Sequence, residues 1–397
     1  MANTQPSSFL QQLTLQATEV KTQLLANLQW LCEFQVLACI PLDGQVAFEE
    51  VADISNVPVD QLQRVVRLMT TAGFLCEQTS GHIAHTPLSA SFVTEPDLLD
   101  AALFLAQVAV PAALKMPRSA HQFSPYNRGL LCPTTTQPES RLMGLAEDVD
   151  PTHPKIQRQF AAYLAHGILD EASAVDEVLK LVDWEAVGAS TVVDVQAQSP
   201  ATITMLAELA PAAQFVVQTS SPSNGHSGLM TGSDGGTGVP SWMTYHLPSS
   251  ISNRVSVQTR TSAATQTVRG VAIYILRVPS PSPIFPWETM RSQTVLELQA
   301  HLQALRTQPN SRIILTALVL PPPGAIDQRT EAMVRLRDMS LLQLSNERQP
   351  SKTEIIELLT GIRDSTGGLV VSREITGPAS AVIGLEVRYQ YSNDRGR

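Results

Sequence analysis

A short apolar strand leads into a turn whose residue types decide which ligands the chain can bind. The run Thr191–Val195 is apolar and β-branched, which is typical of a buried parallel strand. A helical stretch, Ile203–Ala210, and a second strand, Phe215–Val217, follow it and predict a strand–helix–strand unit. The first turn of such a unit holds nucleotide-like ligands, and its glycines let the backbone approach the ligand closely.

The first turn of this unit contains no glycine. It consists of Gln196, Ala197, Gln198, Ser199 and Pro200. Side chains fill the space that a closely approaching ligand needs, and Pro200 removes an N–H that could have faced the ligand. We therefore predict that the frame of a nucleotide-binding unit is kept and that its binding chemistry is lost.

Other polar residues near this unit offer little alternative chemistry. Ser199 lacks the GxSxG context of a nucleophile elbow. Asp194, at the end of the first strand, is expected to cap the turn that follows it. His301 lies among leucines on a predicted helix, and we expect it at the surface or rim of that helix. The stretch 219–241 is rich in glycine, serine and threonine and predicts a flexible loop, because it contains no GxxxxGK[ST] phosphate cradle.

The composition limits the classes of function. The chain has 397 residues, which suggests two domains or three small ones, and its 43% hydrophobic residues are ample for a sizeable core. A net charge of −9 argues against a nucleic-acid surface. No run reaches the roughly 18 apolar residues of a membrane span, and the N-terminus has no features of a secretion signal. The four cysteines have no CxxC spacing, which favours reduced, buried thiols over a metal site: Cys32, Cys39, Cys76 and Cys132.

The N-terminal region predicts a winged helix. A short helix begins at Phe48, an amphipathic helix follows over Gln61–Ala72, and the runs 74–76 and 82–85 form a predicted hairpin. Residues 1–150 carry 7 Lys and Arg against 15 Asp and Glu, a net charge of −8. Because phosphate contacts supply most non-specific affinity for DNA, we interpret this module as a packing and dimerisation domain.

We place the N-terminal helical domain at 1–117, a linker with connecting helices at 118–182, and a second domain at 183–397. One long helix is expected over Lys155–Leu181. The C-terminal region alternates strands with helices, which predicts a doubly wound parallel α/β sheet. Strands are expected at 255–257, 270–276, 312–320 and 382–389, and helices at 288–306, 327–344 and 352–364.

In this order the elements resemble the S-adenosylmethionine-dependent small-molecule O-methyltransferases of fungi and plants. The resemblance covers nearly the whole chain and implies a Rossmann-like class I methyltransferase domain after the winged helix. It rests on these segments: Val192–Val195, Tyr274–Arg277, Arg312–Leu315, Val319–Pro321, Arg337–Leu342 and Asn346–Arg348.

The resemblance also implies three chemical positions, and the sequence departs from the family at each. The glycine loop is replaced by residues 196–200. An acid that holds the cofactor ribose should follow the second strand, where this chain has Gln218. A His-Asp-Trp sequence should supply the general base, and the corresponding residues are Phe285, Pro286 and Trp287. Because Phe285 cannot accept a proton, we predict no catalytic residue, no cofactor and no metal.

A methyltransferase-like chain without these positions resembles the transcriptional coactivators of fungal polyketide gene clusters, of the aflatoxin-cluster type. This resemblance implies a non-catalytic coactivator of an aromatic polyketide cluster, a homodimer whose partner is a cluster-specific Zn₂Cys₆ transcription factor. It further implies a nuclear location with a cytoplasmic share, no direct DNA binding and no membrane association.

Two alternatives remain open at the level of sequence. One is an active S-adenosylmethionine-dependent O-methyltransferase that acts on an aromatic polyketide. The other is a non-catalytic small-molecule sensor that keeps a substrate pocket, although the bulky apolar residues of its candidate lining are more simply interpreted as plain core. That lining would comprise Met116, Tyr126, Met143, Trp287 and Met339.

Overall fold

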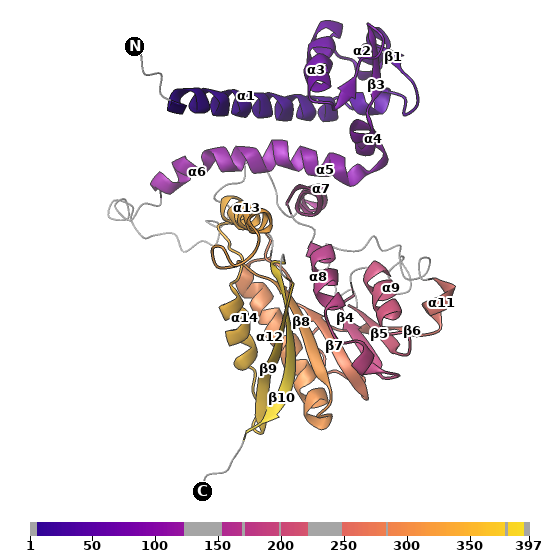
Figure 1. The fold of residues 1–397 in the computed structure, drawn as a ribbon, viewed down its shortest axis with the longest axis vertical. Coiled ribbons are helices and arrows are strands. Elements are labelled where there is room, and N and C mark those ends of the chain that lie inside the picture. The colour runs from indigo at the N-terminus through magenta and orange to yellow at the C-terminus, as the bar shows by residue number, and fades with distance from the viewer. Residues whose placement is uncertain are drawn as a thin grey trace. The chain divides into compact units, whose positions relative to one another are not determined.

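A computed structural model describes residues 6–122, 153–168, 171–197, 200–220, 248–282, 285–377 and 380–392 (Figure 1). The described residues divide into two compact units, the first ending at Gly167 and the second beginning at Ile168. Gln198 and Ser199 of the turn, residues 123–152 of the predicted linker and residues 221–241 of the glycine-rich stretch lie outside the described residues. So do Cys132, Tyr126 and Met143.

The first part of the N-terminal unit packs helices against a small sheet. Its elements are α1 (Pro6–Glu33), a 3₁₀ turn η1 (Val36–Cys39), β1 (Val46–Ala47), α2 (Phe48–Ser55), α3 (Val59–Thr71), β2 (Leu75–Cys76), β3 (His82–His85) and α4 (Pro87–Thr94). The three strands are antiparallel in the order β1-β3-β2, and Leu75 pairs with His85 as the predicted hairpin requires. Leu31, Phe48 and Leu62 lie in its core. The assignment of this arrangement to the winged-helix class stays a prediction.

The second part of the unit is helical. It comprises α5 (Pro96–Phe104), a π-helical turn η2 (Leu105–Ala109), α6 (Val110–Gln122), α7 (Pro154–Ala162) and a second π-helical turn η5 (Tyr163–Ile168). Rings of Phe104, Phe160 and Tyr163 pack with centroids 5.2–5.4 Å apart. By length and composition alone the helix Pro96–Met116 could span a membrane, a test that core helices also pass, and 39% of its most apolar window is buried.

The prediction of a single long helix over residues 155–181 is wrong. α7 ends at Ala162, a π-helical turn follows, and α8 begins at Glu171. A π-helical turn inserts an extra residue into the helical ladder. Apolar residues that keep a regular spacing in the sequence therefore lie on a different face of the helix after the turn.

The C-terminal unit is an α/β domain built on one sheet of seven described strands. Its elements are α8 (Glu171–Lys180), a 3₁₀ turn η6 (Glu185–Val187), β4 (Thr191–Val195), α9 (Pro200–Leu209), β5 (Gln214–Ser220), α11 (Ser249–Ser252), β6 (Val255–Arg260), β7 (Val271–Arg277), α12 (Trp287–Thr307), β8 (Arg312–Leu318), α13 (Gln328–Ser345), α14 (Lys352–Thr360), β9 (Gly367–Thr376) and β10 (Val382–Tyr391). The strand order is β6-β5-β4-β7-β8-β10-β9.

The sheet is parallel from β6 to β8, as predicted, and antiparallel at one edge. β10 runs antiparallel to both β8 and β9, and β9 was missed by the sequence analysis. A connection of five residues joins β9 to β10, which is too short for the crossover that a parallel pair needs. The expectation of a wholly parallel sheet is therefore corrected to a mixed one.

Alternate residues of each central strand face opposite layers. Val193 and Tyr274 belong to the core under α12 and α14, whereas Val192 and Ile273 belong to the core under α8, α9 and α13. Helices thus cover both faces of the sheet, which explains why the central strands are almost continuously apolar (Figure 1).

Candidate ligand crevice of the sheet

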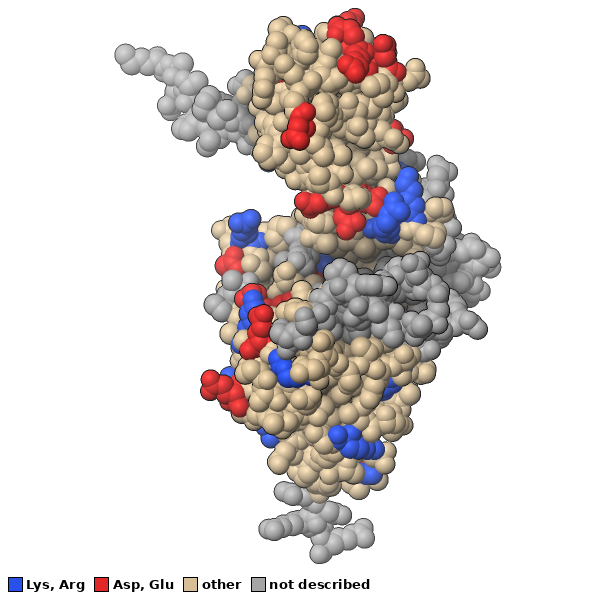
Figure 2. Space-filling view, turned by 90° about the vertical axis from the view of Figure 1, so that its right-hand side faces the viewer, with Lys and Arg blue, Asp and Glu red and all other residues tan. Residues whose placement is uncertain are grey.

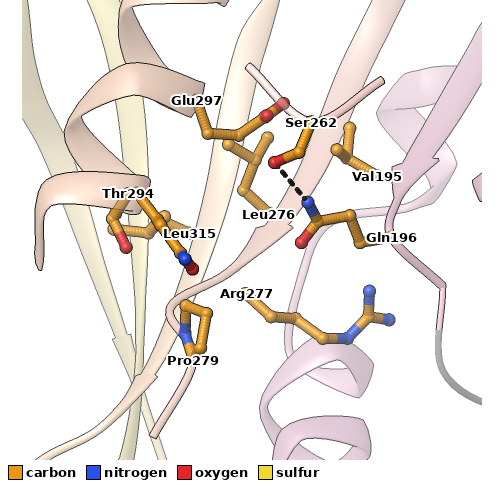
Figure 3. A pocket seen from close by; sticks show the side chains of 10 residues that line it. Val195, Gln196, Ser262, Leu276, Arg277, Pro279, Thr294, Glu297 and Leu315 are labelled. Carbon is orange, nitrogen blue, oxygen red and sulfur yellow. Dashed lines mark hydrogen bonds between the residues drawn. The ribbon is translucent and has the colours of Figure 1, made fainter. Parts of the chain in front are cut away.

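The crevice that could hold a ligand lies above the carboxyl ends of β4 to β7. The strand order reverses between β4 and β7, and open α/β sheets bind ligands at such a switch point. A cavity there has a volume of about 30 Å³ and is lined by Gln196, Ser262, Arg277 and Glu297, among others (Figure 3). Since one water needs about 10–15 Å³ on this measure, the cavity has room for about two waters.

The first residue of the turn after β4 has a backbone conformation that favours glycine. Gln196 has a φ of 57°, in the left-handed region that favours glycine. Its side-chain amide donates to the Ser262 hydroxyl at 3.3 Å, across the crevice (Figure 3). Ala197 packs against the core, and Pro200 occupies the first position of α9, where a missing N–H is tolerated.

The Asp194 carboxylate pairs with a charged side chain of the neighbouring strand, while residues 198 and 199 of the turn that it is expected to cap lie outside the described residues. This carboxylate is 1% exposed and forms a bidentate ion pair with the guanidinium of Arg277, with the longer contact at 3.2 Å. Asp194 is in register with Ile275 on the neighbouring strand, so Arg277 lies two residues further on the same face. A tertiary ion pair therefore uses the carboxylate that local sequence assigned to the turn.

Gln218, where the resemblance implies a ribose-binding acid, is locked in a buried amide pair. It is 2% exposed and exchanges two hydrogen bonds with Gln266, at 3.0 and 2.9 Å. Gln266 is fully buried, donates its second amide hydrogen to Nε2 of His301 at 3.0 Å, and accepts from the Val268 N–H at 3.1 Å. Both donors and both acceptor sites of the Gln266 amide are thus used within the protein.

His301 lies inside the protein, and its expected surface position is wrong. The ring is 0% exposed, its Nδ1–H donates to the Glu297 carbonyl at 2.8 Å, and it contacts the edge of the Tyr274 ring. Burial lowers the pKa of His301 to about 4, so the imidazole is neutral at neutral pH. Because its Nε2 already accepts from Gln266, His301 is not a free general base.

Glu297 fixes the segment that follows β6. Its carboxylate pairs with the guanidinium of Arg260 and accepts the Ala263 N–H at 2.7 Å. The same guanidinium donates to the Ala264 carbonyl. Neither Gln266 nor Glu297 was singled out from the sequence, because a glutamine in a Ser/Thr/Ala-rich loop and a glutamate on a helix normally face solvent.

Phe285 occupies the position that the resemblance assigns to the base. Its ring is half-buried against the core, while its backbone bonds with Ser282. Trp287 is buried at the start of α12, and its backbone N–H donates to the Glu347 carboxylate at 3.3 Å. Of the remaining candidates for a substrate pocket, Met116 lies on α6 and Met339 on α13.

The described part of the chain holds no group of three or more His, Cys, Asp or Glu side chains that could bind a metal ion. Cys32 is buried, Cys39 and Cys76 are half-buried, and all three are free thiols. The crevice therefore offers amides, hydroxyls and paired charges rather than an unpaired acid or base.

Solved structures define the class of the fold. The mitomycin 7-O-methyltransferase MmcR matches 97% of this chain and 99% of its own with a TM-score of 0.61 and 15% identity. The dimethyltransferase RosA of Streptomyces davawensis matches 97% and 99% with a TM-score of 0.62, also at 15% identity. The fold is that of class I O-methyltransferases.

Sequence relatives define the family within that class. The aflatoxin cluster transcriptional coactivator aflS of Aspergillus parasiticus is 38% identical over 99% of this chain and 87% of its own. The monodictyphenone cluster transcriptional coactivator mdpA of Emericella nidulans is 38% identical over 98% and 86%. The dothistromin biosynthesis regulatory protein aflJ of Dothistroma septosporum is 37% identical over 97% and 85%. No family model matches the sequence. The chain belongs to the family of fungal polyketide-cluster transcriptional coactivators.

Proposed function

We propose that this protein is a non-catalytic transcriptional coactivator of a fungal aromatic polyketide gene cluster. Its family supports the regulatory role, since relatives that align with nearly the whole chain are named coactivators. The observation that carries the non-catalytic part is the buried contact of Gln218 with Gln266 and His301, which fills the crevice with the protein's own side chains.

The crevice lacks the means to hold S-adenosylmethionine. Gln218 offers an amide, already paired, where a ribose diol would need a carboxylate. The cavity of about 30 Å³ is far too small for a nucleoside. At the base position, the Phe285 ring has no atom that can take a proton from a substrate hydroxyl. Cofactor binding and base catalysis are therefore both lost in this proposal.

The proposed partner is a cluster-specific Zn₂Cys₆ transcription factor, and the proposed location is the nucleus with a cytoplasmic share. Acidic side chains gather on the N-terminal unit, where Glu49, Glu50 and Asp53 are exposed on α2 (Figure 2). Such a surface repels DNA and complements the basic region of a DNA-binding protein. DNA contact is thus left to the partner.

A homodimer is the second part of the partner proposal. The helix Pro96–Met116 is apolar, yet most of its apolar window is not buried within one chain, and Leu114 is 77% exposed. A second copy of the same helix would cover this surface without any other protein.

The proposal is tested by two measurements on the purified full chain. Calorimetric titration with S-adenosylmethionine and S-adenosylhomocysteine should give no binding heat at millimolar ligand, and micromolar binding would overturn the non-catalytic assignment. Co-purification with the Zn₂Cys₆ factor of the same cluster should succeed and should weaken when Glu49, Glu50 and Asp53 are changed to lysine. Glu208→Lys, an exposed acid of the other unit, is the matched control.

A further inference from the structure

The segment between β6 and β7, residues 261–270, does not leave the crevice open. Its side chains and backbone are attached to three different elements around the carboxyl ends of the strands. Ser262 accepts from Gln196 after β4, the Ala263 N–H donates to Glu297 on α12, and Gln266 pairs with Gln218 on β5. In addition, the backbone N–H of Gln266 donates to the Ala300 carbonyl at 3.0 Å.

The attachment holds a strained backbone in place. Ala263 has a φ of 61°, a left-handed conformation that costs an alanine roughly 1–2 kcal/mol. A residue keeps such a conformation only when its surroundings fix it, and here the Glu297 carboxylate accepts its N–H at 2.7 Å. Glu297 is itself fixed, because Arg260 pairs with it and also donates to the Ala264 carbonyl.

Gln266 presents the kind of groups that a bound nucleoside would present. A ribose diol offers hydroxyl donors and acceptors to the side chain at the end of the second parallel strand. Gln266 offers an amide donor and an amide acceptor to Gln218 at this position, and both are satisfied. Full burial of Gln266 shows that its side chain lies within the protein rather than over its surface.

We propose that residues 261–270 are a plug that lies over the nucleoside half of the former ligand crevice; seven of its ten residues are exposed, and the buried side chain of Gln266 fastens it there. The plug satisfies buried polar side chains of β5 and α12, namely Gln218, Glu297 and His301, from within the chain itself. This inference deepens the non-catalytic part of the proposed function and rests on it.

Native-state hydrogen–deuterium exchange of the full chain tests the plug. In the unchanged protein the amides of Ala263 and Gln266 should exchange at least about 100-fold more slowly than exposed loop amides, because both donate to buried acceptors. Gln266→Met keeps the side-chain volume but removes the amide contacts, and should speed exchange across 261–268 at least about tenfold. Thr267→Ala, an exposed neighbour, should leave the rates unchanged.

Two results would overturn the plug: rapid exchange of 261–268 in the unchanged protein, or unchanged protection in Gln266→Met. Should Gln266→Met fail to fold, the exchange rates of the unchanged protein still decide the question. Titration with S-adenosylhomocysteine separates the two proposals. Micromolar binding contradicts the proposed function, whereas rapid exchange of 261–268 without binding contradicts the plug alone.

Discussion

The crevice above β4–β7 and the helix Pro96–Met116 differ in what they bury and what they expose. The crevice buries polar side chains, whereas the helix exposes apolar surface. In the crevice, Gln218 and Gln266 are buried with their amides paired, so that this region needs no ligand. Along the helix, only 39% of the most apolar window is buried, and Leu114 is 77% exposed. The contrast separates a region whose buried polar groups are paired within the chain from a helix that leaves a large apolar side chain exposed.

The largest effect is expected when the ion pair between Asp194 and Arg277 is removed. Asp194→Ala leaves the Arg277 guanidinium without its partner in a site where it is only 10% exposed. We expect the free energy of unfolding to fall by about 3–5 kcal/mol, because a buried charge is left uncompensated. Urea unfolding measures this change, with the exposed Glu208→Ala as control. A loss below about 1 kcal/mol would show that water reaches Arg277 freely.

Lowering the pH should reduce the stability that the crevice residues contribute more than the stability that the helical surface contributes. The pKa of His301 is lowered from 6.5 to about 4 in the folded protein by burial, with Glu297, Arg260 and Tyr274 facing the ring. Between pH 6.5 and 4 the unfolded chain therefore takes up a proton that the folded chain does not. The stabilisation is fully present above pH 6.5 and falls by up to about 3 kcal/mol as the pH drops to 4.

The variant His301→Gln checks this prediction, since it keeps an acceptor for Gln266 and removes the titrating ring. Its free energy of unfolding, measured by urea titration from pH 7 to pH 4, should depend less steeply on pH than that of the unchanged protein. Equal slopes in the two proteins would mean that His301 does not titrate in this window.

A charge on the exposed helix tests the other side of the comparison. Leu114→Glu should raise the dissociation constant of self-association at least about tenfold, because a carboxylate would enter an apolar interface. The free energy of unfolding of the single chain should change by less than about 0.5 kcal/mol. Sedimentation velocity measures the association, and Leu88→Glu, 55% exposed on α4, is the control. Equal association of both variants would place the interface elsewhere.

The smallest expected effect concerns the turn itself. Gln196→Gly removes the strain of a left-handed backbone at φ 57° but raises the conformational entropy of the unfolded chain. Because the two effects oppose each other, we expect the free energy of unfolding to change by no more than about 1 kcal/mol. The substitution should not create binding of S-adenosylmethionine, because Gln218 and Gln266 still fill the crevice. Ser262→Ala removes the same hydrogen bond without the change in backbone freedom. Calorimetric binding by Gln196→Gly would show that the turn alone excludes the cofactor.

The strands with strong apolar runs were predictable, and the edge of the sheet was not. β4, β5, β7 and β8 lie where continuous Val, Ile and Leu placed them, because strands covered on both faces need such residues. In β9 the apolar residues are interrupted by polar and charged ones, such as Arg373 and Glu374. For this reason the strand was missed. The helix over 155–181 was predicted too long, since helical spacing alone does not reveal a π-helical turn.

Within the crevice, the sequence showed which residue types are missing, but it did not show which side chains contact one another. The missing glycines of residues 196–200, the missing acid at Gln218 and the aromatic ring of Phe285 are visible in the sequence itself. The partners of Asp194, His301 and Gln266 lie 83, 4 and 48 residues away along the chain. No local pattern pairs residues at the longer of these separations.

By itself, the sequence determined most of the order of strands and helices, the apolar core and the residue types that stand at 196–200, 218 and 285. Those features depend on local periodicity and on which functional groups each side chain carries. Only the tertiary structure decided how the polar groups of this region are paired, because folding brings β5, α12 and the segment 261–270 together and leaves their buried amides to satisfy one another.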